Sequence, residues 1–423
     1  MDAYIPRMVD RALERKLKGK GAVLIQGPKW CGKTTTAEQV AHSIVYMDEP
    51  ERKEQNVQLA DISPSTLLEG DTPRLIDEWQ IAPKLWDAVR FAVDHRSGKG
   101  HFILTGSSVP PDLSETTHSG TGRFAWLTMR NMSLYESGES SGEVSIGELF
   151  DGCESVTGTN TLDIHRIAHL VCRGGWPEVL DLEEDIALEA AFDYLDGVVN
   201  SDISRVDGVQ RDPERARRIM RSYARNQGSQ IAYTEIARDI STNELSFTDE
   251  TVASYVKALK SIFVIEDMLS WNPNLRSKTS MRATDTRYFS DSAIAAAALG
   301  VGPDDLIADL KTFGLLFETM CVRDLRTYAE SLNGGVYHYR DRSGLECDAV
   351  IHLRNGLYGL VEIKLGGDRL INEGAANLSK LESMIDTEKM SAPCFKVVLT
   401  GTDRYAYRRP DGIYVVPVGC LRA

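Results

Sequence analysis

The stretch Gly27-Pro-Lys-Trp-Cys-Gly-Lys-Thr34 has the spacing GxxxxGK[ST], with two glycines that bracket four variable residues. It follows the short apolar run Ala22–Gln26 and leads into a helical composition from Thr34 onward. A loop between a strand and a helix can turn its backbone N–H groups toward phosphate oxygens, and the positive end of the helix adds to the attraction. The pattern therefore predicts a phosphate-binding loop.

The polar residues of this loop have separate expected roles in binding ATP with Mg2+. We expect Lys33 to reach the β- and γ-phosphates and Thr34 to ligate the magnesium ion. A glycine loop that arose by chance is the alternative, and the flanking strand and helix disfavour it. The other residues of the predicted nucleotide site are Gly27, Pro28, Gly32 and Thr35.

Two carboxylates, Asp77 and Glu78, directly follow the apolar residues of a second predicted strand. We expect Asp77 to hold the magnesium shell and Glu78 to polarise the attacking water. Solvated acids at a strand end are the alternative, which the phosphate loop upstream disfavours. Thr105 or Ser107, at the end of a further strand, is expected to contact the γ-phosphate or the water.

Arg123 lies on the glycine-flanked stretch Gly120–Phe124 and has two interpretations. It stabilises transition-state charge on a nucleotide held by a neighbouring copy in a homo-oligomer, or it pairs with a surface acid. The second interpretation is simpler and is favoured.

Strands alternate with helices in the first part of the chain, which implies a parallel sheet covered on both faces. The expected strands are Ala22–Gln26, Ser43–Met47, Arg74–Ile76 and Phe102–Thr105, with a helix from Lys84 to Val93. From about residue 161 the pattern becomes helical, and after Thr312 strands return. We therefore divide the α/β chain into a P-loop ATPase domain with a helical lid (1–205), a middle segment (206–308) and a second α/β domain (309–423).

The middle segment has the pattern of a helix-turn-helix. Ile231–Ile240 forms the first helix, Thr248 caps the second, and Val264–Trp271 would form a wing. The second helix carries two lysines against two acids, fewer basic groups than DNA recognition requires, so packing or oligomerisation is favoured. Six arginines between residues 211 and 225 contact phosphate or form a solvated helix face, and the latter is favoured.

Two carboxylates and a lysine in the last domain, Asp348, Glu362 and Lys364, form the pattern of a magnesium-dependent nuclease. Carboxylates are ligands for a hard cation, and a neighbouring lysine can orient water and stabilise charge on a phosphate. Glu318, on the helix expected from Phe313 to Ala329, would complete the metal-binding cluster. The alternative is a cross-strand ladder of salt bridges on a solvated sheet face.

The hairpin between the two strands decides whether these residues meet. A three-residue loop of Arg354-Asn-Gly356, with the glycine left-handed, makes Asp348 face Glu362 and Glu346 face Lys364. A two-residue turn sends Asp348 to the opposite face of the sheet. The nuclease interpretation therefore requires the three-residue loop.

These motifs together resemble the prokaryotic AAA-type ATPases that carry a C-terminal domain of unknown function with a restriction-nuclease-like, PD-(D/E)xK core. The resemblance implies a winged-helix middle segment and a nuclease-like last domain, which either cleaves nucleic acid or only binds it. Trp30, Cys31 and Cys347 depart from the usual pattern without altering a chemical group. The matching motifs are Gly27–Thr35, Ile76–Gln80, Leu104–Ser108, Gly122-Arg123, Ser133–Glu136, Gly174–Glu178, Tyr288–Asp291, Phe317-Glu318, Tyr339-Arg340, Glu346–Asp348 and Glu362–Lys364.

The amino-acid composition limits the classes of protein to which this chain can belong. The 423 residues carry a net charge of −14, and the last 113 are nearly neutral, so the acidity belongs to the first 310. Seven scattered cysteines without a CxxC pair indicate reduced thiols and a cytoplasmic location. The first twenty residues lack the apolar core of a signal peptide, and no apolar run is long enough to span a membrane.

The sequence as a whole predicts ATP hydrolysis with magnesium, coupled to action on DNA or RNA. The alternative function is a nucleotide-switched binding or regulatory protein whose last domain does not cut.

Overall fold

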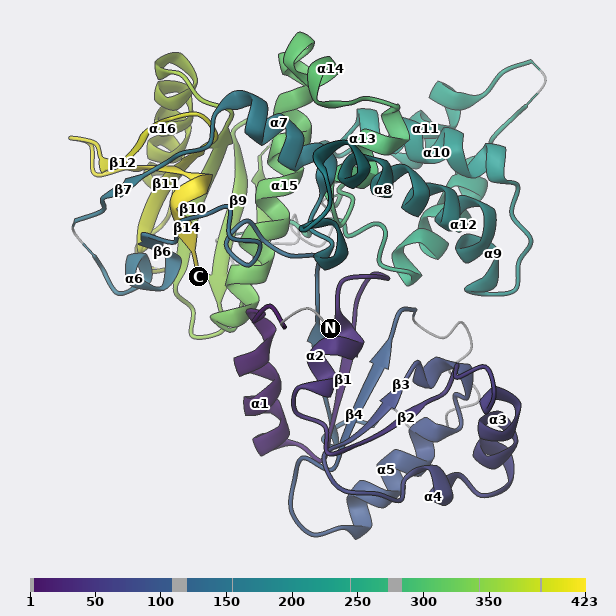
Figure 1. The fold of residues 1–423 in the computed structure, drawn as a ribbon. Coiled ribbons are helices and arrows are strands. Elements are labelled where there is room, and N and C mark those ends of the chain that lie inside the picture. Colours follow the sequence, from purple (N-terminus) through teal and green to yellow (C-terminus); the bar gives the residue numbers. More distant parts are fainter. Residues whose placement is uncertain are drawn as a thin grey trace. The chain divides into compact units, whose positions relative to one another are not determined.

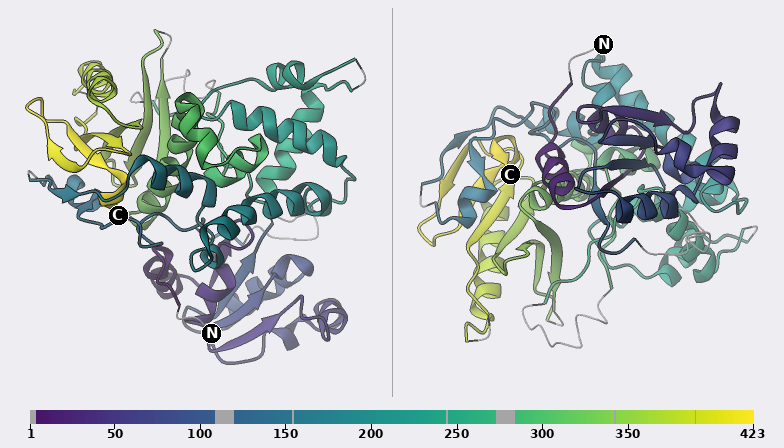
Figure 2. Two further views of the ribbon diagram at one scale, coloured as in Figure 1. Left: turned by 45° about the horizontal axis from the view of Figure 1, so that its top comes forward. Right: turned by 90° about the horizontal axis from the view of Figure 1, so that it is seen from below.

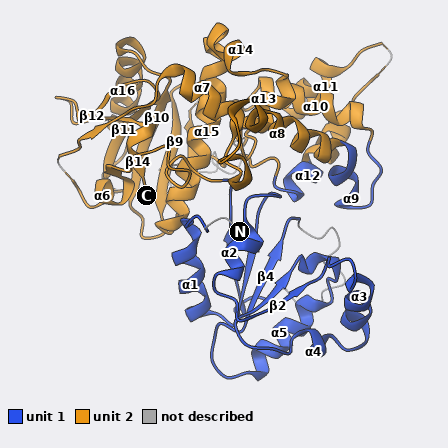
Figure 3. Cartoon of the chain, in the orientation of Figure 1, with its two compact units in different colours: residues 1–131, 200–211, 257–263 blue, residues 132–199, 212–256, 264–423 orange. Residues whose placement is uncertain are grey.

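The computed structural model describes residues 4–108, 120–153, 155–243, 245–272, 284–341, 343–388 and 390–423. The chain divides into two compact units, coloured separately in Figure 3. The first unit holds residues 1–131, 200–211 and 257–263, and the second holds residues 132–199, 212–256 and 264–423. The chain therefore passes from one unit to the other at five points.

The first unit contains a five-stranded parallel sheet in the order β2-β3-β4-β1-β5 (Figure 1). The alternation of strands and helices predicted such a sheet, and the prediction is confirmed. Its strands are β1 (Ala22–Gln26), β2 (Ser43–Tyr46), β3 (Arg74–Asp77), β4 (Phe102–Gly106) and β5 (Phe124–Thr128). The helices of this unit are α1 (Val9–Gly19), α2 (Lys33–Glu38), α3 (Lys53–Ile62), α4 (Pro64–Leu67), α5 (Leu85–His95) and α9 (Ile203–Arg205).

The central strand β1 explains why this sheet is stable. It pairs with β4 on one side and β5 on the other, so the run Ala22–Gln26 is enclosed by neighbours. Helix α1 packs beside it with its apolar side chains at helical spacing, among them the buried Leu13 and Leu17. Around Trp86, which stacks on Phe124, a second apolar cluster fills the space beside the strands. Each such buried side chain contributes about 1.5–3 kcal/mol by leaving water.

The second unit contains a seven-stranded mixed sheet in the order β7-β12-β13-β11-β10-β9-β8. Figure 2 shows its green and yellow C-terminal strands from two further sides. Helix α16 (Asp368–Ser383) covers β9, β10 and β11, and helix α15 (Leu310–Ser331) packs against β8, β9 and β10 (Figure 1). The strands are β7 (Gly158–Thr159), β8 (Gly334–Arg340), β9 (Glu346–Leu353), β10 (Tyr358–Lys364), β11 (Phe395–Thr400), β12 (Tyr405–Arg408) and β13 (Tyr414–Pro417). A separate short pair joins β6 (Val144–Ser145) to β14 (Leu421–Arg422).

The helical stretch after residue 131 belongs to the second unit, whereas the sequence analysis grouped it with the P-loop sheet. The reason is long-range: the backbone N–H of Leu134 donates to Asp324 at 2.9 Å, and that of Met132 donates to the carbonyl of Gly175 at 2.6 Å. The other helices assigned wholly to this unit are α6 (Ile146–Phe150), α7 (Ile164–Arg173), α8 (Glu184–Gly197), α10 (Pro213–Arg225), α11 (Tyr233–Ile240), α13 (Ser292–Leu299) and α14 (Pro303–Ala308).

The helices expected for the middle segment are present. Helix α11 is followed by α12 (Asp249–Ser261), and Thr248 caps α12 by accepting the N–H of Thr251 at 3.2 Å, as expected. The expected wing makes antiparallel bridges, Ile265 with Phe289 and Met268 with Thr286. Residues 273–283 lie outside the described part of the chain. The winged-helix interpretation itself stays a prediction.

A buried ion cluster ties distant parts of the second unit together. Arg323 on α15, with 2% of its side chain exposed, donates to Asp291 at 3.0 Å and contacts Asp324 at 2.8 Å. Asp291 also accepts the N–H of Gly175 at 3.1 Å, and Asp324 accepts that of Leu134. Because these carboxylates are out of water, the guanidinium between them is needed to offset their charge.

Replacing Arg323 with methionine should therefore destabilise the second unit. The methionine keeps most of the volume but leaves two buried carboxylates without their cation, a loss of about 3–5 kcal/mol. Thermal unfolding followed by circular dichroism measures the change. The matched control is Arg369→Met, because Arg369 forms an ion pair with Glu373 while 84% of its side chain is exposed. Equal midpoints for the two variants would contradict this account of the cluster.

Candidate functional site

The loop from Gly27 to Thr34 has the backbone shape that its sequence predicted. It joins the end of β1 to the start of α2, and both bracketing glycines have positive φ, 157° for Gly27 and 97° for Gly32. A Cβ on Gly27 would lie 1.9 Å from the carbonyl oxygen of Met129, so only glycine fits there. The helix that follows begins at Lys33 and points its first N–H groups toward the loop.

Lys33 and Thr34, the two residues expected to contact the phosphates and magnesium, have defined partners. The buried Lys33 ammonium donates to the carbonyl oxygen of Pro28 at 2.7 Å, inside the loop. The Thr34 hydroxyl donates to Oδ1 of Asp77 at 2.7 Å. Thr35, also expected in the nucleotide site, is exposed on α2. The loop thus directs the side chains of Lys33 and Thr34 toward the same region of the site.

Asp77 ends strand β3 and is the point at which three segments converge. Its Oδ1 accepts the hydroxyls of Thr34, at 2.7 Å, and of Thr105, at 2.5 Å. Thr105 lies on β4, which pairs with β3, so the two side chains are neighbours at the same edge of the sheet. Burial raises the pKa of Asp77, and the two hydroxyl donors oppose that shift. The hydroxyls thus favour the ionised carboxylate that a cation requires.

Glu78 occupies an unusual backbone conformation, with φ of 53° in the left-handed region. Such a conformation is costly for a non-glycine residue and is often found at functional sites. Its Oε2 accepts the hydroxyl of Ser107 at 3.0 Å and the side-chain amide of Gln80. Burial raises the pKa of Glu78, while the charge of Lys33 lowers it. The carboxylate is therefore held in one orientation close to the phosphate loop.

Thr105 and Ser107 were alternatives for a contact to the nucleotide, and the structure gives each a different carboxylate. Thr105 bonds to Asp77, and Ser107 bonds to Glu78. Whether either contacts a γ-phosphate stays a prediction. Gln80 was missed as a partner of Glu78, although its place two residues after the acid is a usable signal.

The residues present fit a bound magnesium ion. A hydroxyl from Thr34 and a carboxylate from Asp77 are oxygen donors within hydrogen-bond distance of each other, and Mg2+ prefers such ligands and keeps several waters. Thr34 and Asp77 would hold the ion, which would neutralise charge on the phosphates.

Arg123 does not line the phosphate site of its own chain. It precedes β5, whose first residue Phe124 pairs with Ala22 at the start of β1, whereas the phosphate loop follows the end of β1. Five residues of strand, about 16 Å, separate the two edges. Its guanidinium donates to Asp94 at 2.8 Å, so the surface-pair interpretation is confirmed. A contact of Arg123 to a nucleotide held by a neighbouring copy stays a prediction.

One support of the phosphate loop was missed by the sequence analysis. The buried Arg7 donates to the carbonyl oxygens of Cys31, at 2.6 Å, and Arg130, at 2.9 Å. It thereby ties the loop to the segment that leaves β5. No local motif marks Arg7, because its partners lie 24 and 123 residues away.

In the second unit, the predicted three-residue hairpin is confirmed. The register runs from Tyr358 opposite His352 to Val361 opposite Ala349, and Gly356 has φ of 92°. The next step of this register places Glu362 opposite Asp348. The two carboxylates therefore lie on one face of the sheet, as the nuclease interpretation requires.

Lys364 lies between the two carboxylates. Its ammonium is 3.0 Å from Oδ2 of Asp348 and 2.7 Å from Oε2 of Glu362. Asp348 also accepts the backbone N–H of Ile363 at 2.7 Å. Glu346 was expected to face Lys364, and the β9–β10 pairs that the structure gives end before these two residues, so this stays a prediction. On the other side of β9, the Glu346 carboxylate pairs with Arg340 at 3.1 Å, because the β8–β9 register places those two residues opposite each other.

Glu318 approaches this group from α15. Its Oε1 accepts the hydroxyl of the buried Tyr288, which comes from the middle segment. Burial, and then the charge of Asp348, raises the pKa of Glu318 to about 8. The same two causes raise the pKa of Glu362 to about 8, against the opposing charge of Lys364. The environment of both glutamates therefore favours their protonated forms more than water does.

The three carboxylates do not form a metal centre as they stand. Within the described ranges of the chain, no group of three or more His, Cys, Asp or Glu side chains is arranged to hold a metal ion. The expected cluster of Glu318, Asp348 and Glu362 is therefore corrected: the Lys364 ammonium occupies the space between two of its members. One feature still fits a cation. Among the described residues, no donor meets hydrogen-bond geometry at Oε1 of the buried Glu362, although the Asn377 side chain lies near enough to lower the pKa of this carboxyl.

The space beside Asp348 is small. A cavity of about 20 Å³, lined by Tyr288, Glu318, Arg340 and Asp348 among others, has room for about one water molecule. Helix α16 closes over Glu362 and Lys364, because Gly374 lets it approach: a Cβ there would lie 3.3 Å from Cβ of Glu362. A phosphodiester can reach these carboxylates only if this enclosure opens.

Three family models match separate parts of the chain. A model described as an AAA domain matches residues 19–137, and two described as domains of unknown function, DUF8612 and DUF4143, match residues 164–305 and 313–421. Residues 19–137 are thus similar to an AAA domain, in agreement with the phosphate loop and the parallel sheet. The DUF4143 match agrees with the resemblance stated for the last domain and adds no fold or activity.

Whole-chain comparisons give distant relatives. Uncharacterized proteins of Mycobacterium bovis and Mycobacterium tuberculosis are each 24% identical over 357 residues, which is 83% of this chain and 72% of theirs. Among solved structures, a Walker-type ATPase of Pyrococcus abyssi is 15% identical, with a TM-score of 0.42, over 68% of this chain and 94% of that one. Among the described residues, no helix is long and apolar enough to cross a membrane.

The raised pKa of Glu318 predicts a pH dependence of stability. An unfolded glutamate titrates near 4.5 and the folded one near 8, so the folded state binds this proton more tightly. The resulting stability is fully present below pH 4.5 and is lost as the pH rises toward 8, by an amount on the order of a few kcal/mol.

Glu318→Gln should therefore flatten the fall of the unfolding midpoint between pH 5 and 9, measured in EDTA. Glu373→Gln, at an exposed position on α16, is the control and should follow the wild type. If the unfolding midpoint of the Glu318 variant fell with pH as steeply as that of the wild type, the assignment of this pH dependence to Glu318 would be refuted.

Proposed function

We propose that this protein binds ATP with Mg2+ at the loop Gly27–Thr34 and hydrolyses it. One observation carries the proposal: Asp77 and Glu78 end a strand beside the phosphate loop, and separate hydroxyls hold each carboxylate. An isolated pair of acids at a strand end would be solvated, whereas Asp77 is 5% exposed and bonded to the loop itself.

The residues of the site have separate roles in hydrolysis. Lys33 must exchange its bond to Pro28 for the β- and γ-phosphates, which supply the charge that a carbonyl oxygen lacks. Glu78 accepts a proton from the attacking water, and its bonds to Ser107 and Gln80 fix the direction from which it does so. Thr34 and Asp77 provide the magnesium ligands.

Two substitutions separate binding from turnover. Lys33→Ala should abolish ATP binding, because the γ-phosphate loses its cation. Glu78→Gln should bind ATP with unchanged affinity but hydrolyse it about 10²–10⁴-fold more slowly, since only proton transfer is removed. Phosphate release and equilibrium binding of a fluorescent ATP analogue measure the two effects.

Arg52→Ala is the control, because Arg52 forms an exposed pair with Glu49 in the same unit. Wild-type turnover in both site variants would remove the basis of the ATPase proposal.

We further propose that hydrolysis is coupled to action on nucleic acid by residues 309–423, with a restriction-nuclease-like fold. The support is the confirmed hairpin, which puts Asp348 and Glu362 on one face with Lys364 between them. Within the described part of the chain, Oε1 of Glu362 accepts no hydrogen bond in good geometry, which favours a site that takes a cation during its cycle. The enclosure of this site favours the alternative, a nucleotide-switched binding protein whose last domain does not cut.

A nuclease assay decides between the two functions. If the domain cleaves, Mg2+-dependent cleavage of DNA or RNA should fall by at least 100-fold in both Asp348→Ala and Lys364→Ala. Arg369→Ala, on the exposed face of α16, should cleave like the wild type. Absence of cleavage with every nucleic acid, with and without ATP, would instead support the binding protein.

Arg123 keeps one possible role in this proposal, at the nucleotide of a neighbouring copy in a homo-oligomer. Its bond to Asp94 is an exposed ion pair, which costs little to break. The winged-helix interpretation of residues 206–308 and the cytoplasmic location likewise belong to the proposal.

A further inference from the structure

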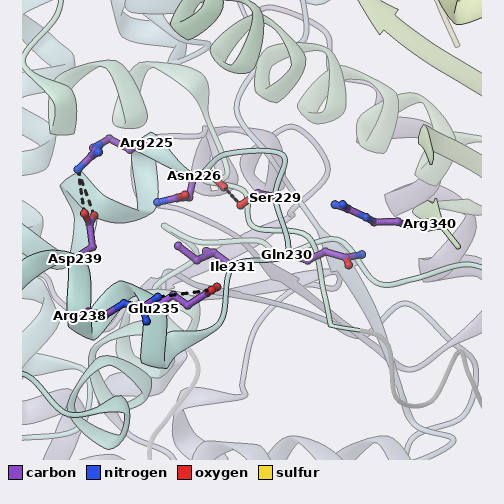
Figure 4. Close-up of a pocket in the computed structure, with 9 residues that line it drawn as sticks. All are labelled: Arg225, Asn226, Ser229, Gln230, Ile231, Glu235, Arg238, Asp239 and Arg340. Carbon is purple, nitrogen blue, oxygen red and sulfur yellow. Dashed lines mark hydrogen bonds and ion pairs between the residues drawn. The ribbon is translucent and has the colours of Figure 1, made fainter. Parts of the chain in front are cut away.

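An open groove runs along the second unit beside the small cavity of the carboxylate site. Its volume is about 820 Å³, and Figure 4 shows the side chains that line it. They come from the end of α10, the segment after it, helix α11, and the last residue of β8. The polar residues among them that the argument uses are Arg225, Asn226, Ser229, Gln230, Arg238 and Arg340.

The groove is close to neutral in an acidic chain. Its lining contains three arginines and two acids, Glu235 and Asp239, and a third acid, Glu346, pairs with Arg340, whereas the whole chain has a net charge of −14. The arginines are accessible, with 61% of the Arg225 side chain, 80% of Arg238 and 45% of Arg340 exposed. Exposed guanidinium groups in a neutral region can bind a polyanion even where the protein as a whole repels it.

Each arginine has a carboxylate partner that a phosphate can replace. Arg225 contacts Asp239 at 3.2 Å, Arg238 contacts Glu235 at 3.8 Å, and Arg340 contacts Glu346 at 3.1 Å. Exposed ion pairs of this kind contribute little to stability. A guanidinium binds phosphate in a bidentate manner. Replacing the carboxylate partner with a phosphate therefore exchanges a weaker contact for a stronger one.

The groove borders the small cavity of the carboxylate site. Gln230 and Arg340 line both the groove and the small cavity that contains Asp348 and Glu318. A chain of phosphates held along the arginines would therefore lie beside the enclosure of Asp348 and would reach that residue once the enclosure opens. This adjacency distinguishes the groove from an ordinary patch of surface arginines.

The chemistry of the lining indicates which polyanion fits. Of the lining residues that the structure describes, none is aromatic, and Ile231 alone is apolar. Proteins that hold single strands stack the unpaired bases on aromatic side chains. Arginine, amide and hydroxyl side chains instead contact the phosphates and sugars of a duplex, which positions it without reading its sequence.

We propose that this groove holds the sugar-phosphate backbone of a nucleic acid duplex and delivers it to the carboxylate site. The proposal rests on the proposed action on nucleic acid and names the surface and the form of its substrate. It assigns the contact to α10, α11 and Arg340, and not to the second helix of the expected helix-turn-helix. Binding should be independent of sequence and strongly weakened by salt.

Fluorescence anisotropy with a 20-base-pair DNA duplex of mixed sequence tests the proposal, with EDTA present so that nothing is cleaved. The variant replaces Arg225, Arg238 and Arg340 with alanine. Loss of three phosphate contacts should reduce the slope of log K against log[salt] by about 2.7, at 0.9 per contact. The single-stranded form of the same DNA should bind the wild type more weakly than the duplex.

The control variant removes the same charge elsewhere in the unit, by replacing the exposed Arg369, Arg404 and Arg408 with alanine. It should bind duplex like the wild type. An equal loss in the control, or tighter binding of the single strand, would overturn the proposal. If the groove variant unfolds, slowed amide hydrogen exchange in residues 225–240 of the wild type on adding duplex supports the same conclusion, and unchanged exchange contradicts it.

The test is separate from those of the proposed activities. ATP turnover of Lys33→Ala and cleavage by Asp348→Ala report on those activities, whereas anisotropy in EDTA requires neither. Duplex binding that is lost in the groove variant supports the groove even if the domain never cuts. A wild type that binds no duplex overturns the groove while leaving the ATPase proposal intact.

Discussion

The two hydrogen bonds that Asp77 accepts, from Thr34 and from Thr105, join three separate segments into one nucleotide site. They are possible because parallel strands end at the same edge of a sheet, where the loops that follow them meet. The phosphate loop follows β1, Asp77 ends β3, and Thr105 is the penultimate residue of β4, which lies between those strands. The position of Glu78 depends on the same edge, because its partner Ser107 directly follows β4. The strand order thus determines which side chains can act on a nucleotide.

In the second unit, the comparable constraint is the register of one hairpin. The three-residue loop Arg354–Gly356 makes Asp348 and Glu362 neighbours, and a shift of one residue would separate them. The register does not decide which function Asp348 and Glu362 have. With Lys364 between them and Tyr288 on Glu318, the group is satisfied by protein atoms except at Oε1 of Glu362. The same geometry therefore suits a nuclease at rest and a domain that only binds.

The sequence predicted those parts of both sites that local patterns encode. Apolar runs bounded by glycines and acids located β1, β3 and β4, and Gly356 indicated the correct hairpin loop. Features that depend on long-range packing could not be predicted from the sequence. The pairing of Leu134 with Asp324 spans 190 residues, so nothing near residue 132 showed that this segment joins the second unit. The surface acid expected for Arg123 is a similar case: its partner Asp94 lies 29 residues away, so the sequence predicted an acid without identifying which one.

The site of Asp77 and Glu78 differs from that of Asp348 and Glu362 in which groups contact the carboxylates. This difference affects how each site could bind a metal ion. Asp77 and Glu78 are held by hydroxyl and amide donors, which orient a carboxylate without cancelling its charge, so both carboxylates would be available to a magnesium ion. Asp348 and Glu362 already share an ammonium, and a metal ion would have to displace or share it in a buried space. Phosphate is a competing partner for Lys364, because the ammonium that binds two carboxylates can also bind a phosphodiester. A substrate that draws Lys364 away would leave the two carboxylates free for a cation, so binding of nucleic acid and of metal at this site would depend on each other.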